Sequence, residues 1–280
     1  MKILIIQENG RHEKNRRFRE CFSLQRALIA NGQECTVWGL NHDNWNQAIA
    51  FNDFDVIINL ENYDDIGWVP NLKDCKAYKA IWCIDAHCRG LMPYLKTYNE
   101  GRYNIILQAT KDYLNEFSVW FPNCYDDTLL QPRDIPKRAD VGFCGNVQNR
   151  GPVLDLLKNN FNFLADIFVI GDDMVNAINS YQIHFNMNIS NDINYRSFET
   201  IGCKIPLITN YNSQYEELGF KDGNNCLMYK TVPELVDKLK AGLADPDVLK
   251  TIAEFGYLLA KKHTYDQRAK KLIKFLETKI

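Results

Sequence analysis

Short apolar runs alternate with helix-like patterns along the first part of the chain. Between the first two runs, Phe18, Phe22, Leu24, Ala27 and Leu28 recur at helical spacing, and Asn31-Gly32 supplies a helix stop. Buried strands joined by helices in this way predict a parallel sheet with helices on both faces. The predicted strands are Ile3–Ile6, Cys35–Trp38, Val56–Asn59, Ala80–Ile84 and Ile105–Leu107.

The alternation breaks at residues 129–138, where two prolines and four charged residues stand within ten positions. It then restarts, so we expect two doubly wound domains, residues 1–130 and 139–262. Ligands of such folds bind where the strands end, and we expect a cleft between the carboxyl ends of the two sheets. The later predicted strands are Asp140–Cys144, Ile167–Ile170, Ile183–Met187, Ile205–Thr209 and Cys226–Tyr229. The later predicted helices are Pro152–Asn159, Met174–Ser180, Arg196–Ile201, Pro233–Leu243, Pro246–Ala260 and Tyr265–Lys279.

Composition excludes several classes of protein. Hydrophobic residues make up 46% and charged residues 24% of the 280 positions, which is typical of a globular protein. The net charge of -2 gives no overall drive towards nucleic acid or anionic membranes. The 9 cysteines are scattered without a C-x-x-C pair, as expected in a reducing cytoplasm. No apolar stretch is long enough for a membrane helix or a secretory signal.

The second domain contains a candidate phosphate site after its first strand. That strand runs into the turn Gly145–Arg150, and a helix follows near Pro152. A glycine turn at a helix start presents free N–H groups to an anion, and Arg150 would add a charge-assisted hydrogen bond. The alternative is an ordinary strand-to-helix turn with a solvated arginine.

A second candidate element precedes Gly202. Arg196 and Glu199 are three residues apart and share a face near the start of a short predicted helix. Arg196 would meet the phosphates of a nucleotide diphosphate, and the Glu199 carboxylate would accept hydrogen bonds from ribose hydroxyls. The alternative is an ion pair within the helix.

The order of motifs in the later half resembles the CgeB-like (spore-maturation-type) glycosyltransferases, which have the GT-B fold of two facing Rossmann-like domains. The first ~110 residues, about the size of one domain, match only in their strand–helix rhythm, as expected if that half holds a divergent acceptor site. The matching segments are Phe121–Asp126, Gly145–Arg150, Tyr181, His184–Asn188, Arg196–Glu199, Gly202, Pro206–Thr209, Asp222-Gly223, Tyr229, His263–Tyr265 and Arg268.

The resemblance implies a nucleotide-sugar donor, a UDP- or GDP-sugar, bound by the second domain, with no obligatory cofactor. It also implies that residues 263–280 form a helix crossing back onto the N-terminal domain, with His263 and Tyr265 as structural anchors. The residues expected to bind the donor are Gly145, Asn146, Arg150, Tyr181, Asn188, Arg196, Phe198 and Glu199.

Glycosyl transfer needs a group that receives the proton of the acceptor hydroxyl. Asp85 and His87 follow a predicted strand, and a spacing of two in an extended segment would place both side chains on one side. The alternative is that Asp85 caps a turn and His87 bonds locally. Glu8 and Glu61 also follow strands and are weaker candidates.

The most basic segment, residues 11–19, follows the first strand. Arg11, His12 and Arg16 are its candidate acceptor-binding residues, for an acceptor that carries phosphate or is nucleic acid. The alternative is a solvated helix face. The acidic pairs at residues 53/55, 64/65, 126/127 and 172/173 fit turns or helix caps, so we expect no obligatory metal.

These observations favour a cytoplasmic, metal-independent glycosyltransferase, a monomer or weak dimer, that moves a sugar from a nucleotide diphosphate to a hydroxyl of a glycan, small molecule or lipid-linked acceptor. Three alternatives stay open. They are a glycosyltransferase acting on modified bases of DNA, a sugar-nucleotide epimerase with a GT-B-like fold, and a non-catalytic partner that keeps the fold.

Overall fold

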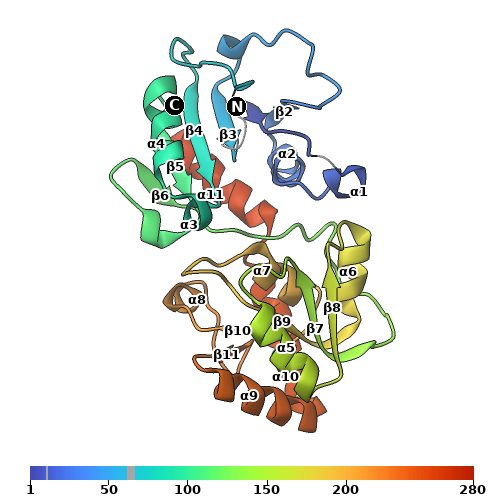
Figure 1. The fold of residues 1–280 in the computed structure, drawn as a ribbon. Helices are drawn as coiled ribbons and strands as arrows, with labels where there is room; N and C mark the ends of the chain where they lie inside the picture. The colour runs from blue at the N-terminus through green and yellow to red at the C-terminus, as the bar shows by residue number, and fades with distance from the viewer. Residues whose placement is uncertain (11, 62–66) are drawn as a thin grey trace. The chain divides into compact units, whose positions relative to one another are not determined.

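The computed structural model describes residues 1–10, 12–61 and 67–280. The chain divides into two compact units, one of residues 1–122 with 265–280 and the other of residues 123–264 (Figure 1). The predicted linker at 129–138 belongs to the second unit, where Arg133 donates to Asp172 at 2.8 Å and to Asn176 at 2.6 Å. Lys137 in the same segment donates to the carbonyl oxygen of Asn179.

The first unit is built on a six-stranded parallel sheet in the order β2-β1-β3-β4-β5-β6. Its central strands are buried on both faces, as β-branched runs in a parallel sheet require. Leu4, Ile57, Ile81 and Ile106 from neighbouring strands form its core. The strands are β1 (Lys2–Ile6), β2 (Glu34–Trp38), β3 (Val56–Leu60), β4 (Tyr78–Cys83), β5 (Ile105–Gln108) and β6 (Ser118–Trp120).

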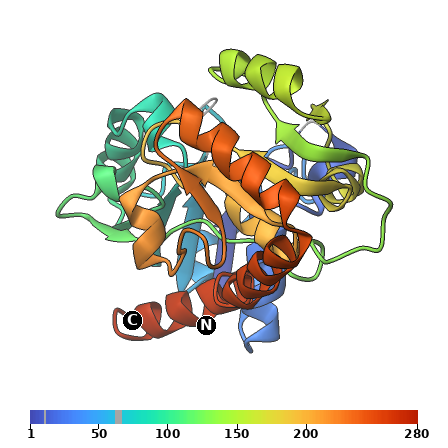
Figure 2. The same cartoon turned by 90° about the horizontal axis from the view of Figure 1, so that it is seen from below.

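Helices complete the first unit. The last helix of the chain packs on α2, where Asn31 donates to Asp266 at 2.8 Å, and Figure 2 shows this dark red helix beside the blue N-terminal part. Tyr265 at its start packs against the ring of Trp82 in β4. The helices are α1 (Glu13–Arg16), α2 (Glu20–Ala30), α3 (Ala86–Arg89), α4 (Met92–Gly101) and α11 (Tyr265–Glu277).

The second unit holds a five-stranded parallel sheet in the order β11-β10-β9-β7-β8. Val141, Phe143, Ile183, Phe185 and Ile208 supply its core from three strands. The strands are β7 (Ala139–Gly145), β8 (Phe163–Ile167), β9 (Tyr181–Asn186), β10 (Leu207–Asn210) and β11 (Leu227–Tyr229). The helices are α5 (Gly151–Asn160), α6 (Asp172–Asn179), α7 (Tyr195–Gly202), α8 (Ser213–Glu217), α9 (Val232–Ala244) and α10 (Pro246–Ala260).

One predicted strand is misplaced. The structure puts β8 at Phe163–Ile167 rather than at residues 167–170. Phe168 has a left-handed backbone (φ 57) and is 78% exposed, so the apolar run that suggested a strand is a surface loop. No helix in the described part of the chain is long and apolar enough to cross a membrane.

Candidate functional site

The carboxyl ends of β7 and β9 in the second unit bring together several of the predicted donor-binding residues. β7 ends at Gly145, and the exposed turn from Asn146 leads to α5. Asn146 shapes this turn by accepting the backbone N–H of Gln148 at 2.9 Å. The two predicted arginines, Arg150 and Arg196, join this turn and the start of α7 to the carboxyl ends of these strands.

Arg196 connects α7 to β7. Its Nε donates to the carbonyl oxygen of Cys144 at 3.0 Å, and its Nη1 donates to Glu199 and to the sulfur of Met174. The Arg196 and Glu199 side chains are 20% and 14% exposed. The ion pair within the helix, considered above as an alternative, is therefore present. Nη2 of Arg196 makes no hydrogen bond within the described residues, so one nitrogen of the guanidinium is not committed.

Arg150 supports the turn. Its Nε donates to the carbonyl oxygen of Met187 at 2.9 Å, and its Nη1 donates to those of Asn146 at 3.0 Å and Gln148 at 3.2 Å. Arg150 is only 9% exposed. Its charge therefore holds the turn in shape through three carbonyl groups, and a direct hydrogen bond to phosphate stays a prediction.

Asn188 is a further positioning residue. It is 2% exposed, and its Nδ2 donates to the hydroxyl of Tyr215 at 2.7 Å. Its Oδ1 accepts the backbone N–H of Asn194, the N-cap position of α7, at 3.1 Å. Asn186 bonds to Asn194 and Ser197 beside it. The alternate asparagines Asn186 and Asn188, at and just after the end of β9, are the sequence signal for this network.

Tyr181 and Phe198 are fully buried, so the prediction that their side chains contact a donor has no support in this structure. The Tyr181 hydroxyl donates to Asp166 at 2.5 Å, and its ring lies over Gly142, where an added Cβ would come within 2.1 Å of it. Phe198 packs against Phe220 and the ring of His263. These two motif residues therefore pack inside the unit and do not line its surface.

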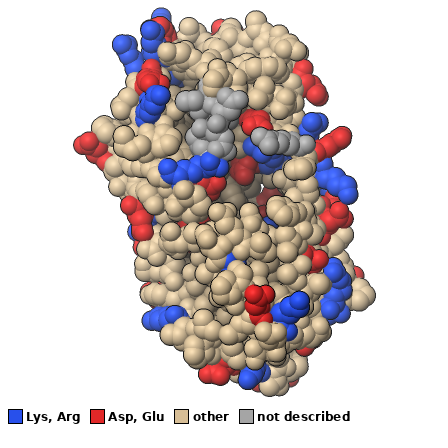
Figure 3. Space-filling view, viewed as in Figure 1, with Lys and Arg blue, Asp and Glu red and all other residues tan. Residues whose placement is uncertain are grey.

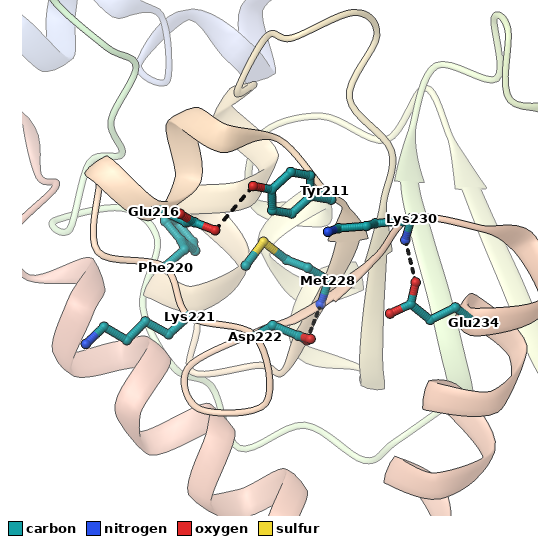
Figure 4. Close-up of a pocket in the computed structure, with 8 residues that line it drawn as sticks. All are labelled: Tyr211, Glu216, Phe220, Lys221, Asp222, Met228, Lys230 and Glu234. Carbon is teal, nitrogen blue, oxygen red and sulfur yellow. Dashed lines mark hydrogen bonds between the residues drawn. The ribbon is translucent and has the colours of Figure 1, made fainter.

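A pocket of about 460 Å³ opens where β10 and β11 end (Figure 4). Tyr211 and Met228 give it an aromatic and an apolar wall, and the Lys230 ammonium lies 4.4 Å from the centre of the Tyr211 ring. The hydroxyl of Tyr211 donates to Glu216. Asp222 and Glu234, which also line the pocket, both pair with Lys238. Two of the carboxylates around this pocket are thus paired with a lysine of the same unit.

In the first unit, the predicted pairing of Asp85 with His87 is wrong in its geometry. Asp85 is the N-cap residue of α3 and His87 lies inside that helix, because the chain turns helical directly after β4. Two residues apart in a helix, side chains diverge rather than sharing one side. Roles for Asp85, His87 and Glu8 in catalysis stay predictions.

Glu61, directly after β3, is the carboxyl group that the structure places most distinctively. It accepts the backbone N–H groups of Ile84 and Asp85 and the hydroxyl of Tyr94 at 2.9 Å. Burial, with the charge of Asp85 as a second cause, raises the pKa of Glu61 to about 8. It therefore joins the ends of β3 and β4 and titrates near neutral pH.

Two of the predicted acceptor-binding residues, His12 and Arg16, follow β1 at α1. His12 is exposed at the N-cap position of α1, and Arg16 is half-buried at the end of that helix. Arg11 and the acidic pair at 64/65 lie outside the described residues. Asp172 and Asp173 open α6, and Asp126 accepts from Thr128 in a turn. Among the described residues no group of three His, Cys, Asp or Glu could hold a metal ion, and metal independence stays a prediction.

Residues 146–274 match the model of a family described as glycosyl transferase-like. This match confirms the prediction of a glycosyltransferase, while the narrower CgeB-like assignment stays a prediction. No curated protein matches the chain.

Solved structures cover almost the whole chain at low identity. Sucrose-phosphate synthase from Thermosynechococcus elongatus has 10% identity and a TM-score of 0.66, over 99% of this chain and 98% of its own. HepE of Anabaena, in complex with UDP and glucose, has 11% identity and a TM-score of 0.66, over 99% and 100%. An alpha-glucosyltransferase in complex with UDP and DNA containing an HMU base has 11% identity and a TM-score of 0.70, over 99% of each chain. These similarities confirm the predicted GT-B fold.

Proposed function

We propose that this protein transfers a sugar from a UDP-sugar to an acceptor hydroxyl, with the donor bound by the second unit. The observation that carries the proposal is the Arg196–Glu199 pair at the start of α7, fixed to the end of β7. The family match begins at residue 146, beside this pair, and two of the similar structures contain UDP. The base and the sugar of the donor are parts of the proposal.

The chemistry follows from the groups at this edge of the sheet. The bond between the anomeric carbon and the diphosphate breaks, so negative charge develops on the leaving oxygen. The N–H groups at the start of α7 and Nη2 of Arg196 stabilise that charge. The carboxylate of Glu199 accepts hydrogen bonds from the ribose, and Arg150 keeps the Gly145 turn open to the phosphates.

The first unit supplies the acceptor side in this proposal. Asp85 is the proposed base that takes the proton of the acceptor hydroxyl, because it lies just beyond the carboxyl end of β4 and its backbone N–H donates to Glu61 at 2.9 Å. His87 and Glu8 are the alternative candidates for this base. Asp85→Asn is expected to abolish sugar transfer while leaving the binding of UDP unchanged.

The test of donor binding is thermal stabilisation by nucleotides. UDP and UDP-glucose are expected to raise the melting temperature more than GDP, ADP or GDP-mannose at equal concentration, because the proposed site binds uridine nucleotides more tightly. A ligand present at a hundred times its Kd stabilises the folded protein by about 2.7 kcal/mol. Arg196→Gln is expected to remove the response.

Lys204→Gln is the matched control, because it breaks an ion pair of the same unit, with Glu254, close to the opposite end of the sheet. It should keep the full response to UDP. The proposal is overturned if no nucleotide stabilises the protein, or if Arg196→Gln and Lys204→Gln respond alike.

A second candidate acceptor is DNA. The alpha-glucosyltransferase of similar fold was solved with DNA, and the segment after β1 of this chain is rich in arginine. Transfer of radiolabelled glucose to hydroxymethylated DNA would support it.

A further inference from the structure

A compact set of buried polar groups lies where β1 and β2 end in the first unit. The loop after β1 is joined to the loop after β2 by the bond from the N–H of Asn9 to the carbonyl oxygen of Leu40, at 2.9 Å. Nε2 of His42 lies 2.8 Å from the carbonyl oxygen of Gln7, and Nδ2 of Asn9 donates to that of Asn41 at 3.1 Å. Gln7, Asn9 and His42 are each less than 9% exposed. The loops therefore form one rigid floor.

Three polar atoms at this floor are buried and have no hydrogen-bond partner within the described residues. They are Oδ1 of Asn9 and the Nε atoms of Arg16 and Arg19. A buried polar atom without a partner is destabilising, because it has lost its hydrogen bonds to water without gaining one in the protein. Such atoms gathered at one place indicate that a partner from outside the chain completes the set.

Among the residues that the structure describes, the two arginines also lack a compensating charge. Neither forms an ion pair within the part of the chain that the structure describes, and the nearby carboxylate of Glu20 accepts from the Gln7 side chain. Arg19 lies flat against Gly10, where an added Cβ would meet its Nη1 at 2.8 Å. Both guanidinium charges, with Asp43 opposing them, act on His42, whose pKa burial lowers below its usual value. Arg19 therefore lies against this floor, and the buried Nε of Arg16 lies near enough for its charge to act on His42.

We propose that Arg16, Arg19 and Asn9 form a site for the phosphate group of a small phosphorylated acceptor. This inference rests on the proposed function and names the class of its acceptor. The two guanidinium groups donate to phosphate oxygens, and Oδ1 of Asn9 accepts from a hydroxyl of the same molecule. A recessed pair of arginines fits a compact phosphate monoester better than the wide backbone of duplex DNA.

The surroundings contain a built-in comparison. Arg17, between the two proposed ligands in sequence, is exposed and stacks on Phe18 with its guanidinium 5.2 Å from the ring centre. Figure 3 shows a group of Lys and Arg side chains over this part of the first unit. A diffuse basic surface would use all of these cations, whereas a defined site uses only Arg16 and Arg19.

The experiment measures binding of inorganic phosphate, glucose 6-phosphate, glucose and a short DNA duplex by calorimetry. We expect phosphate and glucose 6-phosphate to bind and glucose not to bind. Arg16→Gln and Arg19→Gln should each weaken the binding of glucose 6-phosphate about tenfold, the effect of one charge-assisted hydrogen bond. Arg17→Gln should change it less than about twofold, as expected for an exposed charge.

Equal losses in Arg16→Gln and Arg17→Gln, or duplex DNA as the tighter ligand, would overturn the proposal in favour of a diffuse or nucleic-acid surface. Absence of phosphate binding would overturn it outright. The response to UDP, measured on the same variants, should persist in Arg16→Gln, which shows that the variant is folded. Arg196→Gln should keep the binding of glucose 6-phosphate, so failure of the donor proposal is recognised separately.

Discussion

Tyr94 donates its hydroxyl hydrogen to the carboxyl group of Glu61, lying 2.9 Å from Oε2 and 3.1 Å from Oε1. Tyr94 belongs to α4 and Glu61 directly follows β3. The two elements are separated along the chain by β4 and α3. With the N–H groups of Ile84 and Asp85, this bond gives a buried carboxyl group several donors. The end of β4, where the proposed base stands, depends on that carboxyl group.

The pKa of Glu61, raised to about 8 by burial and then by Asp85, predicts a stability that depends on pH. Between pH 4.5 and 8 the folded protein keeps a proton that the unfolded chain has lost. The free energy of unfolding of the wild type should therefore fall relative to that of Glu61→Gln as the pH rises through this window, by up to a few kcal/mol. Urea denaturation at pH 5 and pH 8.5 measures the difference.

Glu100→Gln provides the reference for this measurement, because the Glu100 side chain is 61% exposed. Its stability should follow the wild type at both pH values. A constant gap between wild type and Glu61→Gln across the window would show that Glu61 stays ionised in the folded protein.

Glu199→Gln is expected to weaken UDP binding about tenfold or more, equivalent to about 1.4 kcal/mol. The variant removes a charged acceptor for the ribose and also leaves Arg196 without its partner. Calorimetry of the binding of UDP and of inorganic pyrophosphate, which lacks the ribose and the base, separates the two effects. A loss confined to UDP locates Glu199 at the nucleoside, whereas unchanged UDP affinity would contradict the ribose role.

Gly142→Ala is expected to destabilise the second unit by about 1–3 kcal/mol or more, since the new methyl group would overlap the ring of Tyr181 at 2.1 Å. Gly151→Ala in α5 has open space around the new Cβ and should be neutral or slightly stabilising. The free energy of unfolding in urea compares the two. Similar values for both variants would show that β7 and β9 separate easily at this point.

Tyr181→Phe tests the structural role assigned to a motif residue. It removes the hydrogen bond to Asp166 and should cost about 1–2 kcal/mol of stability. The affinity for UDP should be unchanged, because the side chain is fully buried. A large loss of UDP affinity with intact stability would return Tyr181 to the donor site.

The fold class and most strands could be predicted because the apolar runs of a parallel sheet are local signals, whereas the short β6 was missed. The position of β8 was predicted wrongly because this strand lies at the edge of its sheet. There Asp166 interrupts the apolar pattern, and the apolar Phe168 after it suggested that the strand continued. The helical start after β4, which separates Asp85 from His87, depends on tertiary bonds to Glu61 that no local pattern contains.

The sequence predicted where several residues of the second unit lie, whereas their binding of a donor stays a prediction. Arg196 and Glu199 stand where the motif placed them, but burial decides that Arg150 and Asn188 hold backbone and that Tyr181 packs. The orphaned atoms of Asn9 and Arg19 could not be foreseen, because whether a polar atom finds a partner is a property of the folded chain.

The return of residues 265–280 to the first unit sets an order for folding during synthesis. The middle of the chain is one continuous stretch and can complete its own core as soon as it leaves the ribosome. The first unit emerges earlier, yet the helix that covers α2 and reaches Trp82 is translated after the whole of the second unit. The first unit therefore keeps an uncovered apolar face until the second unit has been synthesised and the last helix has followed it.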